Sequence, residues 1–155
     1  MDKPVIKILL DLLDENYGEL RFSDKQIEIR KEKKERGITD KIIFYDIYSR
    51  QGFHREAMEN YILEVKKTIE EDDFFRQAEY YNNVGSYLRL DKSAPTALTR
   101  YKKAKGYIDV FLNDITTAKT ELEIINGNLL KGIIEGNIGR SYFCLLYTSP
   151  SPRDS

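Results

Sequence analysis

Residues 80–104 read YYNNVGSYLRLDKSAPTALTRYKKA. Apolar residues recur every three or four positions on both sides of the turn-forming segment DKSAP, which predicts two helices joined by a short turn. The apolar face of the first helix includes Gly85, and that of the second includes Ala97 and Tyr101. Because small residues let two helices approach closely, this stretch predicts a tightly packed antiparallel pair.

Helical periodicity extends over most of the chain, and no segment shows the alternation typical of a strand. We predict helices over about residues 4–17, 23–37, 39–51, 55–70, 74–90 and 93–112, and a last helix that ends at residue 143. Residues suited to cap these helices are Ser23 with Gln26 as a capping box, Thr39 or Asp40, and Asp72 or Asp73. The segment NGN, residues 126–128, is predicted to turn the chain, with residues 113–125 as either a separate short helix or an extension of the preceding one.

Two stretches share the spacing of their key residues. In IIFYDIYSRQGFHREAMENYILEV, residues 42–65, Tyr45 precedes Ala57 by 12 positions, just as Gly85 precedes Ala97 by 12. Each alanine is followed four positions later by a tyrosine, and IIEGNIGRSYF, residues 133–143, repeats the opening of the pattern. This self-similarity indicates a repeated helix-turn-helix unit.

The pattern resembles the tetratricopeptide repeat, in which a small residue on the first helix faces an alanine on the second, with an aromatic residue four positions later. The 40 residues between Ala57 and Ala97 exceed the family's usual spacing of about 34. The resemblance implies an all-α fold of antiparallel helix-turn-helix repeats stacked as an α-solenoid. The resemblance covers residues 38–143, where the last repeat is incomplete; an N-terminal helical region (1–37) precedes these repeats and a tail of different composition (144–155) follows them.

Composition argues against several classes of function. With 25 basic and 26 acidic residues the net charge is −1, which gives no electrostatic basis for binding nucleic acid or an anionic membrane. No run of about 20 apolar residues predicts a membrane span. One cysteine, Cys144, and one histidine, His54, supply neither a metal site nor a nucleophile–base pair. We therefore expect a cytoplasmic protein that is not an enzyme, with no catalytic residues, no metal and no cofactor.

The resemblance places any ligand on the concave face, which is lined by the first helix of each pair. The residues implied on this face are Asp46, Arg50, Asn82, Ser86, Arg89 and Arg140. Arginine and amide side chains can hold the backbone and carboxylates of an extended peptide, so the expected partner is a protein or peptide. An ordinary solvent-exposed polar face is the alternative.

The tail CLLYTSPSPRDS, residues 144–155, differs in composition from the chain before it. Residues 144–154 resemble the translation, in order, of the end sequence used in transposon-based sequencing libraries. The resemblance implies that the native coding sequence is interrupted near Phe143; a linker rich in serine and proline is the alternative. We expect the tail to pack against nothing, because it has no helical stripe and contains two prolines.

These observations favour a protein–protein interaction module that is a fragment of a longer protein. The alternative is the sensory or regulatory repeat region of a bacterial signalling protein, either a histidine kinase or a helix-turn-helix transcription regulator, because NNVGSYL and LLKGIIEGNIGRSYF look like the repeats found there. On the last helix, the repeat pattern leaves a stripe without a covering helix, made of Leu130, Ile134, Ile138 and Tyr142. We therefore expect either self-association through this stripe or fraying of the chain from about Asn128 onward.

Overall fold

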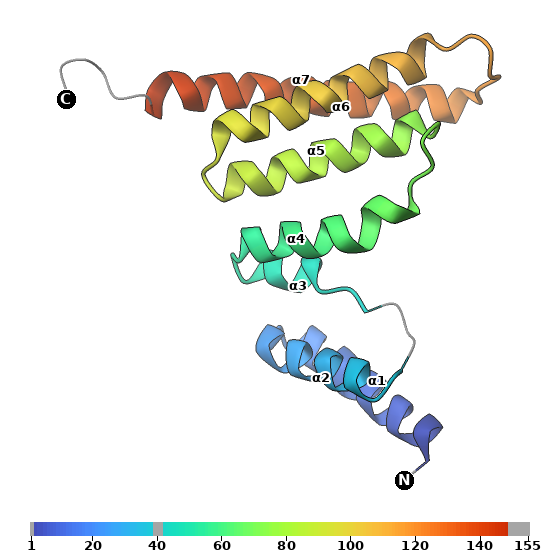
Figure 1. Cartoon of the computed structure of the whole chain (residues 1–155), viewed down its shortest axis with the longest axis vertical. Coiled ribbons are helices and arrows are strands. Elements are labelled where there is room, and N and C mark those ends of the chain that lie inside the picture. Colours follow the sequence, from blue (N-terminus) through green and yellow to red (C-terminus); the bar gives the residue numbers. More distant parts are fainter. Residues whose placement is uncertain (1, 39–41, 149–155) are drawn as a thin grey trace. The chain divides into compact units, whose positions relative to one another are not determined.

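The computed structural model of the protein describes residues 2–38 and 42–148 (Figure 1). All regular secondary structure in these residues is helical, which confirms the predicted all-α class. The elements are α1 (Lys3–Glu19), α2 (Ser23–Glu35), α3 (Tyr45–Arg50), α4 (His54–Val65), the 3-10 turn η1 (Lys66–Thr68), α5 (Phe74–Leu90), α6 (Ala94–Asn113) and α7 (Glu121–Thr148). None of these helices is both long and apolar enough to cross a membrane.

The chain folds as two compact units, Met1–Tyr61 and Ile62–Ser155. In the first unit, α1 packs on α2 as a hairpin. The small core of this hairpin consists of Leu10, Ile29 and Ile38, with Ile6 and Tyr17 packed against them. Many other apolar residues of α1 remain exposed, so the hairpin has little apolar burial to stabilise it.

The turn between α3 and α4 is also in the first unit. The rings of Tyr45 and Tyr61 meet edge to face with their centroids 5.1 Å apart. Ala57 is 0% exposed, and Tyr61 is buried four positions after it. The alanine and tyrosine chosen from their spacing in the sequence are therefore core residues here.

The second unit contains α5, α6 and α7, with α6 packed against both of the others and α5 also in contact with α7 (Figure 1). Its core is formed by Ala78, Ala104, Ile108, Leu130 and Ile134. Asp73 caps α5, as predicted, because its side chain accepts a hydrogen bond of 3.1 Å from the Arg76 amide. The α5–α6 pair is the stretch from which the fold was predicted.

Gly85 sets the close approach of α5 to α6. A Cβ at this position would lie 2.8 Å from the ring of Tyr101, which is 0% exposed. Ala97, on the same helix as Tyr101, is also 0% exposed. The prediction of a tightly packed pair with its small residues in the interface is confirmed.

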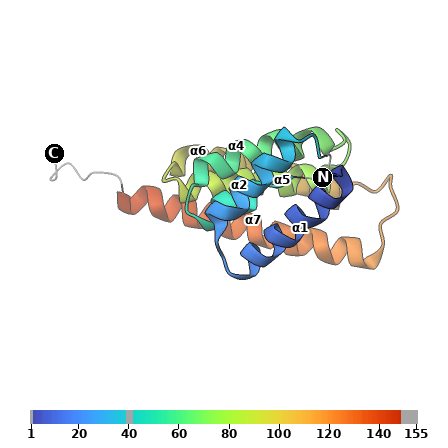
Figure 2. The same cartoon turned by 90° about the horizontal axis from the view of Figure 1, so that it is seen from below.

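The predicted turn at residues 126–128 is wrong, because these residues lie inside α7. The chain turns instead at residues 114–120, the loop at the α6–α7 end of both views (Figures 1 and 2). Thr120 and Glu123 begin α7 as a capping box, with the Glu123 amide donating to Thr120 Oγ1 over 3.1 Å and the Thr120 amide donating to Glu123 Oε1 over 3.3 Å. Gly127 is a packing residue, since a Cβ there would lie 2.8 Å from Leu112 and 2.9 Å from Phe111.

Two other helix boundaries and one helix cap differ from prediction. Helix α3 begins only at Tyr45, and the caps predicted at Thr39 or Asp40 lie outside the described residues. Helix α4 ends at Val65, and the 3-10 turn η1 follows it. Ser23 and Gln26 form no capping box, because the Gln26 side chain donates to Asp14 on α1 instead.

The stripe expected to lack a cover on the last helix faces the interior. Leu130 is 8% exposed and Ile134 is 0% exposed, because they pack on the apolar side chains of α6 and α5. Tyr142, the last of the four residues in that stripe, is 51% exposed. The expectation of an uncovered stripe is therefore wrong for Leu130 and Ile134, which the preceding helices cover, whereas Tyr142 is exposed.

Helix α7 continues through residues 144–148, the beginning of the tail expected to pack against nothing, and that expectation is wrong for the half-buried Cys144 and Leu145. Its last turns extend past the ends of α5 and α6 in both views (Figures 1 and 2). Leu146 and Tyr147 are 75% and 71% exposed, whereas Cys144 and Leu145 are half-buried. Residues 149–155 lie outside the described part.

Helices α1, α2, α3 and α5 end in the same backbone motif. In α1 the Phe22 amide donates to the Tyr17 carbonyl over 2.9 Å, and the Arg21 amide donates to the Gly18 carbonyl over 3.1 Å. The motif needs one residue with positive φ after the helix, and this residue is Gly37 after α2 and Gly52 after α3. In α1 and α5 the residue is a cation, Arg21 at φ 59° and Lys92 at φ 62°.

We expect Arg21→Gly and Lys92→Gly each to raise the free energy of unfolding by roughly 0.5–1 kcal/mol. Glycine adopts positive φ without the steric cost of a Cβ, and this gain outweighs the entropy of the more flexible unfolded chain. Urea unfolding followed by circular dichroism measures the change, and Gly52→Ala, at φ 83°, is the control expected to destabilise. A loss of stability in both cation variants would contradict the prediction.

Candidate ligand-binding surfaces

The six residues predicted to bind a ligand fall in both units. Asp46 and Arg50 lie on α3 in the first, and the remaining four lie on α5 and α7 in the second. Each group is therefore a separate candidate surface with its own surroundings.

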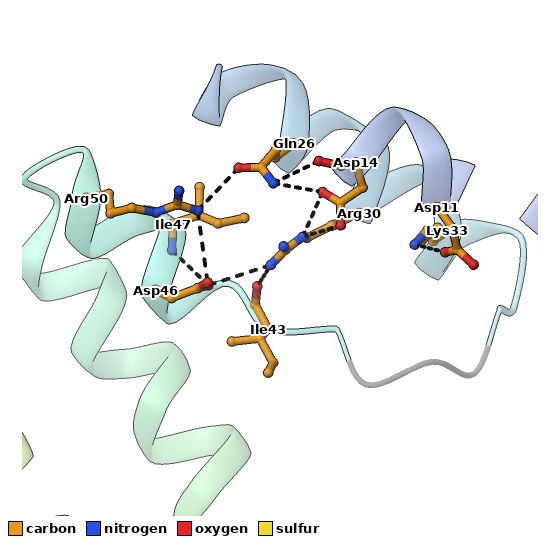
Figure 3. Close-up of polar contacts among 9 residues, drawn as sticks. All are labelled: Asp11, Asp14, Gln26, Arg30, Lys33, Ile43, Asp46, Ile47 and Arg50. Atoms are coloured by element: carbon orange, nitrogen blue, oxygen red, sulfur yellow. Dashed lines mark hydrogen bonds and ion pairs between the residues drawn. The ribbon is translucent and has the colours of Figure 1, made fainter. Parts of the chain in front are cut away.

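A polar network surrounds Asp46 in the first unit (Figure 3). Arg30 on α2 donates to Asp14 on α1 over 3.1 Å, and it also donates to the Ile43 carbonyl ahead of α3. The same guanidinium lies 3.6 Å from a carboxylate oxygen of Asp46. Arg30 thus connects three chain segments, and Asp46 contributes to holding α3 beside α2.

Arg50 is at the edge of this network (Figure 3). It donates to the Gln26 side-chain oxygen over 3.2 Å, and the Gln26 amide donates to the Asp14 carbonyl over 3.0 Å. The side chain of Arg50 is still 45% exposed, and its distance of 4.0 Å to Asp46 leaves the pairing of those charges weak. Arg50 is positioned by the protein and remains accessible to a ligand.

A buried cation lies at the far side of the same hairpin (Figure 3). Lys33 is 6% exposed and pairs with Asp11 on α1. Hydrogen bonds from Lys33, and then from Lys7, hold the pKa of Asp11 below its usual value. This ion pair joins α1 to α2 and offers no open position to a ligand.

An open hollow of about 670 Å³ lies next to Arg50 in the first unit. Its lining comes from the α1–α2 turn and the α3–α4 turn, and it includes three cations, Arg21, Lys25 and Arg50, against one carboxylate, Asp24. Asp24 is itself engaged, accepting a hydrogen bond of 2.6 Å from Gln51. The charge around the hollow is therefore predominantly positive.

Aromatic side chains form the apolar part of this hollow. Phe22 is 55% exposed and Phe53 is 53% exposed, and both line it together with Tyr17. Tyr17 and Phe22 contact each other with ring centroids 6.2 Å apart. The hollow combines exposed aromatic surface with positive charge, which suits a ligand that carries an aromatic group and an anion.

The predicted residues of α5 make contacts within the second unit. Asn82 is 7% exposed, and its side-chain oxygen accepts a hydrogen bond of 2.9 Å from Asn137 on α7. The Ser86 hydroxyl lies 3.1 Å from the Tyr101 hydroxyl, and Arg89 Nε lies 3.4 Å from that same hydroxyl. Asn82 and Ser86 therefore contribute to packing, while Arg140 on α7 is exposed.

Sequence reasoning missed Asn137 and the aromatic residues of the hollow. Asn137 lies between apolar residues of a helical stripe, and this position is the one available signal that it is buried. Phe22 and Phe53 each follow a positive-φ residue at a helix end, a position where an apolar residue often contacts the preceding helix. Their shared hollow depends on two turns about 30 residues apart in sequence and carries no local sequence signal.

In the part of the chain that the structure describes, no group of three or more histidine, cysteine, aspartate or glutamate side chains could hold a metal ion. No protein-family model, curated protein or solved structure matches the chain.

Proposed function

We propose that the chain is a protein-interaction module, built of helical hairpins similar to tetratricopeptide repeats, that binds a peptide in the hollow beside Arg50. The observation that carries this proposal is the combination of three cations with exposed Phe22 and Phe53 around one hollow. The peptide we propose has an aromatic side chain flanked by acidic residues. Its ring would cover the two phenylalanines, and its carboxylates would accept hydrogen bonds from the arginines.

The backbone at Arg21 supports this assignment. Arg21 occupies a position where glycine is favoured, and its side chain lines the hollow. Unfavourable backbone conformations persist most often where a side chain serves a function. Binding gives a reason for a cation at this place, where stability alone favours glycine.

The test uses a fluorescein-labelled hexapeptide with one phenylalanine flanked by glutamates, titrated with the full chain and followed by fluorescence anisotropy. We expect saturable binding that weakens with added salt, because the contacting charges are exposed. The same peptide with alanine in place of phenylalanine, or with lysines in place of glutamates, is expected to bind at least about tenfold more weakly.

Arg21→Gly and Lys92→Gly form a matched pair for the same titration. Both remove one cation from a positive-φ position, but only Arg21 lines the hollow. We expect Arg21→Gly to weaken binding about 5- to 10-fold while stabilising the fold, and Lys92→Gly to leave the Kd unchanged. Equal Kd values for the two variants, or no binding of any peptide by the unmodified chain, would contradict the proposal.

A further inference from the structure

Helix α7 carries two apolar faces. The inner face, described above, packs on α6 and α5. On the opposite face, positions spaced alternately three and four residues apart form a second line, here named the α7 seam: Leu122, Ile125, Leu129, Gly132, Gly136, Gly139, Phe143 and Leu146. This spacing is the one by which two helices pair along their length.

The large residues of the α7 seam are exposed in the second unit. Leu122, Ile125 and Leu129 are 65%, 49% and 61% exposed, and Phe143 is 61% exposed. No charged residue occupies a position of the seam. A continuous apolar line of this kind on a helix is typical of a surface that contacts another protein.

The three glycines of the seam contact no residue of another helix within the described part of the second unit. A Cβ at Gly132, Gly136 or Gly139 would meet no atom within 4 Å. Gly85 and Gly127 differ, because a Cβ at either would lie within 3 Å of a neighbouring side chain. Glycine inside a helix is unfavourable relative to alanine, so three unfilled glycines on one face point to a helix outside the chain that comes close there.

The seam is complementary to itself when reversed. Its first half carries three large residues, and its second half carries three glycines at mirrored positions. Symmetry about the point between Leu130 and Lys131 pairs Leu122 with Gly139, Ile125 with Gly136, and Leu129 with Gly132. A second copy of α7 running antiparallel would thus place each large side chain opposite a glycine, which is the isologous arrangement of a two-fold dimer.

We propose that two copies of the chain associate through antiparallel pairing of their α7 seams in this register. In this register three large side chains of each copy, Leu122, Ile125 and Leu129, face the partner; at roughly 60–120 Å² each, the six side chains together supply roughly 360–720 Å². This area is smaller than that of most specific interfaces, so the dimer is weak and forms only toward the upper end of the micromolar range of protein concentration. The pairing is independent of peptide binding at the hollow in the first unit.

Sedimentation equilibrium of the full chain over about 1–500 µM tests the pairing. We expect reversible dimerisation of the unmodified chain, and at least a tenfold weaker dimer for Gly136→Leu, because the added side chain meets Ile125 of the second copy. Gly106→Leu is the matched control, since Gly106 is exposed on α6 with no atom within 4 Å of a Cβ. This control is expected to dimerise like the unmodified chain.

The double variant Ile125→Gly with Gly136→Ile exchanges the large and small partners and is expected to restore dimerisation, since every pair stays matched in size. A chain that ends at Phe143 is expected to dimerise within about threefold of the full chain, because the paired positions lie between Leu122 and Gly139. A monomer at all concentrations would overturn the proposal and leave the seam for a different protein. If Gly136→Leu strengthens dimerisation, or if dimerisation requires the tail, the proposal is also overturned.

Discussion

Tyr101→Ala is expected to lower the free energy of unfolding of the second unit by roughly 3–5 kcal/mol. Tyr101 is 0% exposed, and its ring fills the space that Gly85 leaves on the facing helix. Removing the ring leaves a cavity between α5 and α6, and it also removes the hydroxyl that Ser86 and Arg89 contact. Urea unfolding followed by circular dichroism measures the loss.

Two further variants test the hydroxyl of Tyr101 and the space that its ring fills. Tyr101→Phe keeps the ring and is expected to lose only about 1 kcal/mol, the usual value of a hydrogen bond. Gly85→Ala is expected to destabilise the unmodified chain but to be tolerated beside Tyr101→Ala, because its Cβ then enters vacated space. A Tyr101→Ala variant within about 1 kcal/mol of the unmodified chain would show that the ring does not hold the two helices together.

Ile134→Ala is expected to lower the free energy of unfolding by roughly 2–5 kcal/mol, whereas Ile133→Ala is expected to change it by less than about 0.5 kcal/mol. The two isoleucines are neighbours on α7, but Ile134 is 0% exposed and Ile133 is 54% exposed. Because the substitution is the same, the difference between the variants reports which face of α7 is packed. Unfolding is measured at about 1 µM protein, where self-association contributes least.

Equal losses from the two variants would mean that α7 is rotated about its axis relative to the structure. A larger loss from Ile133→Ala would mean that the packed face of α7 is not the one that carries Leu130 and Ile134. Either outcome would also remove the basis for the antiparallel pairing, because the exposure of the α7 seam depends on the same orientation of α7.

The α5–α6 hairpin could be predicted from the sequence because its signals are local and agree with one another. Helical periodicity, the DKSAP turn, Gly85 and the Ala97–Tyr101 spacing all indicate one packed pair, and the structure contains it. The beginning of α7 could not be predicted in the same way because two signals conflict. The NGN segment favours a turn, but Thr120 with Glu123 begins the helix earlier, and Gly127 is used for packing.

The candidate site was predictable only where a residue projects from a regular helix. Arg50 was selected from its position on the first helix of a repeat, and it borders the hollow. The rest of that hollow comes from helix ends whose proximity depends on tertiary packing. Asn82 also lies on the first helix of a predicted repeat, but its surroundings are decided by Asn137, 55 residues later.

The hydrogen bond between Asn82 and Asn137 has a consequence for how α7 is aligned along α5. Apolar stripes repeat every three or four residues, so a helix displaced by one turn still finds apolar partners. The two amides do not repeat, and a displaced α7 would leave both of them buried without a partner. This polar contact therefore favours one register of α7 on α5 among several with similar apolar contact.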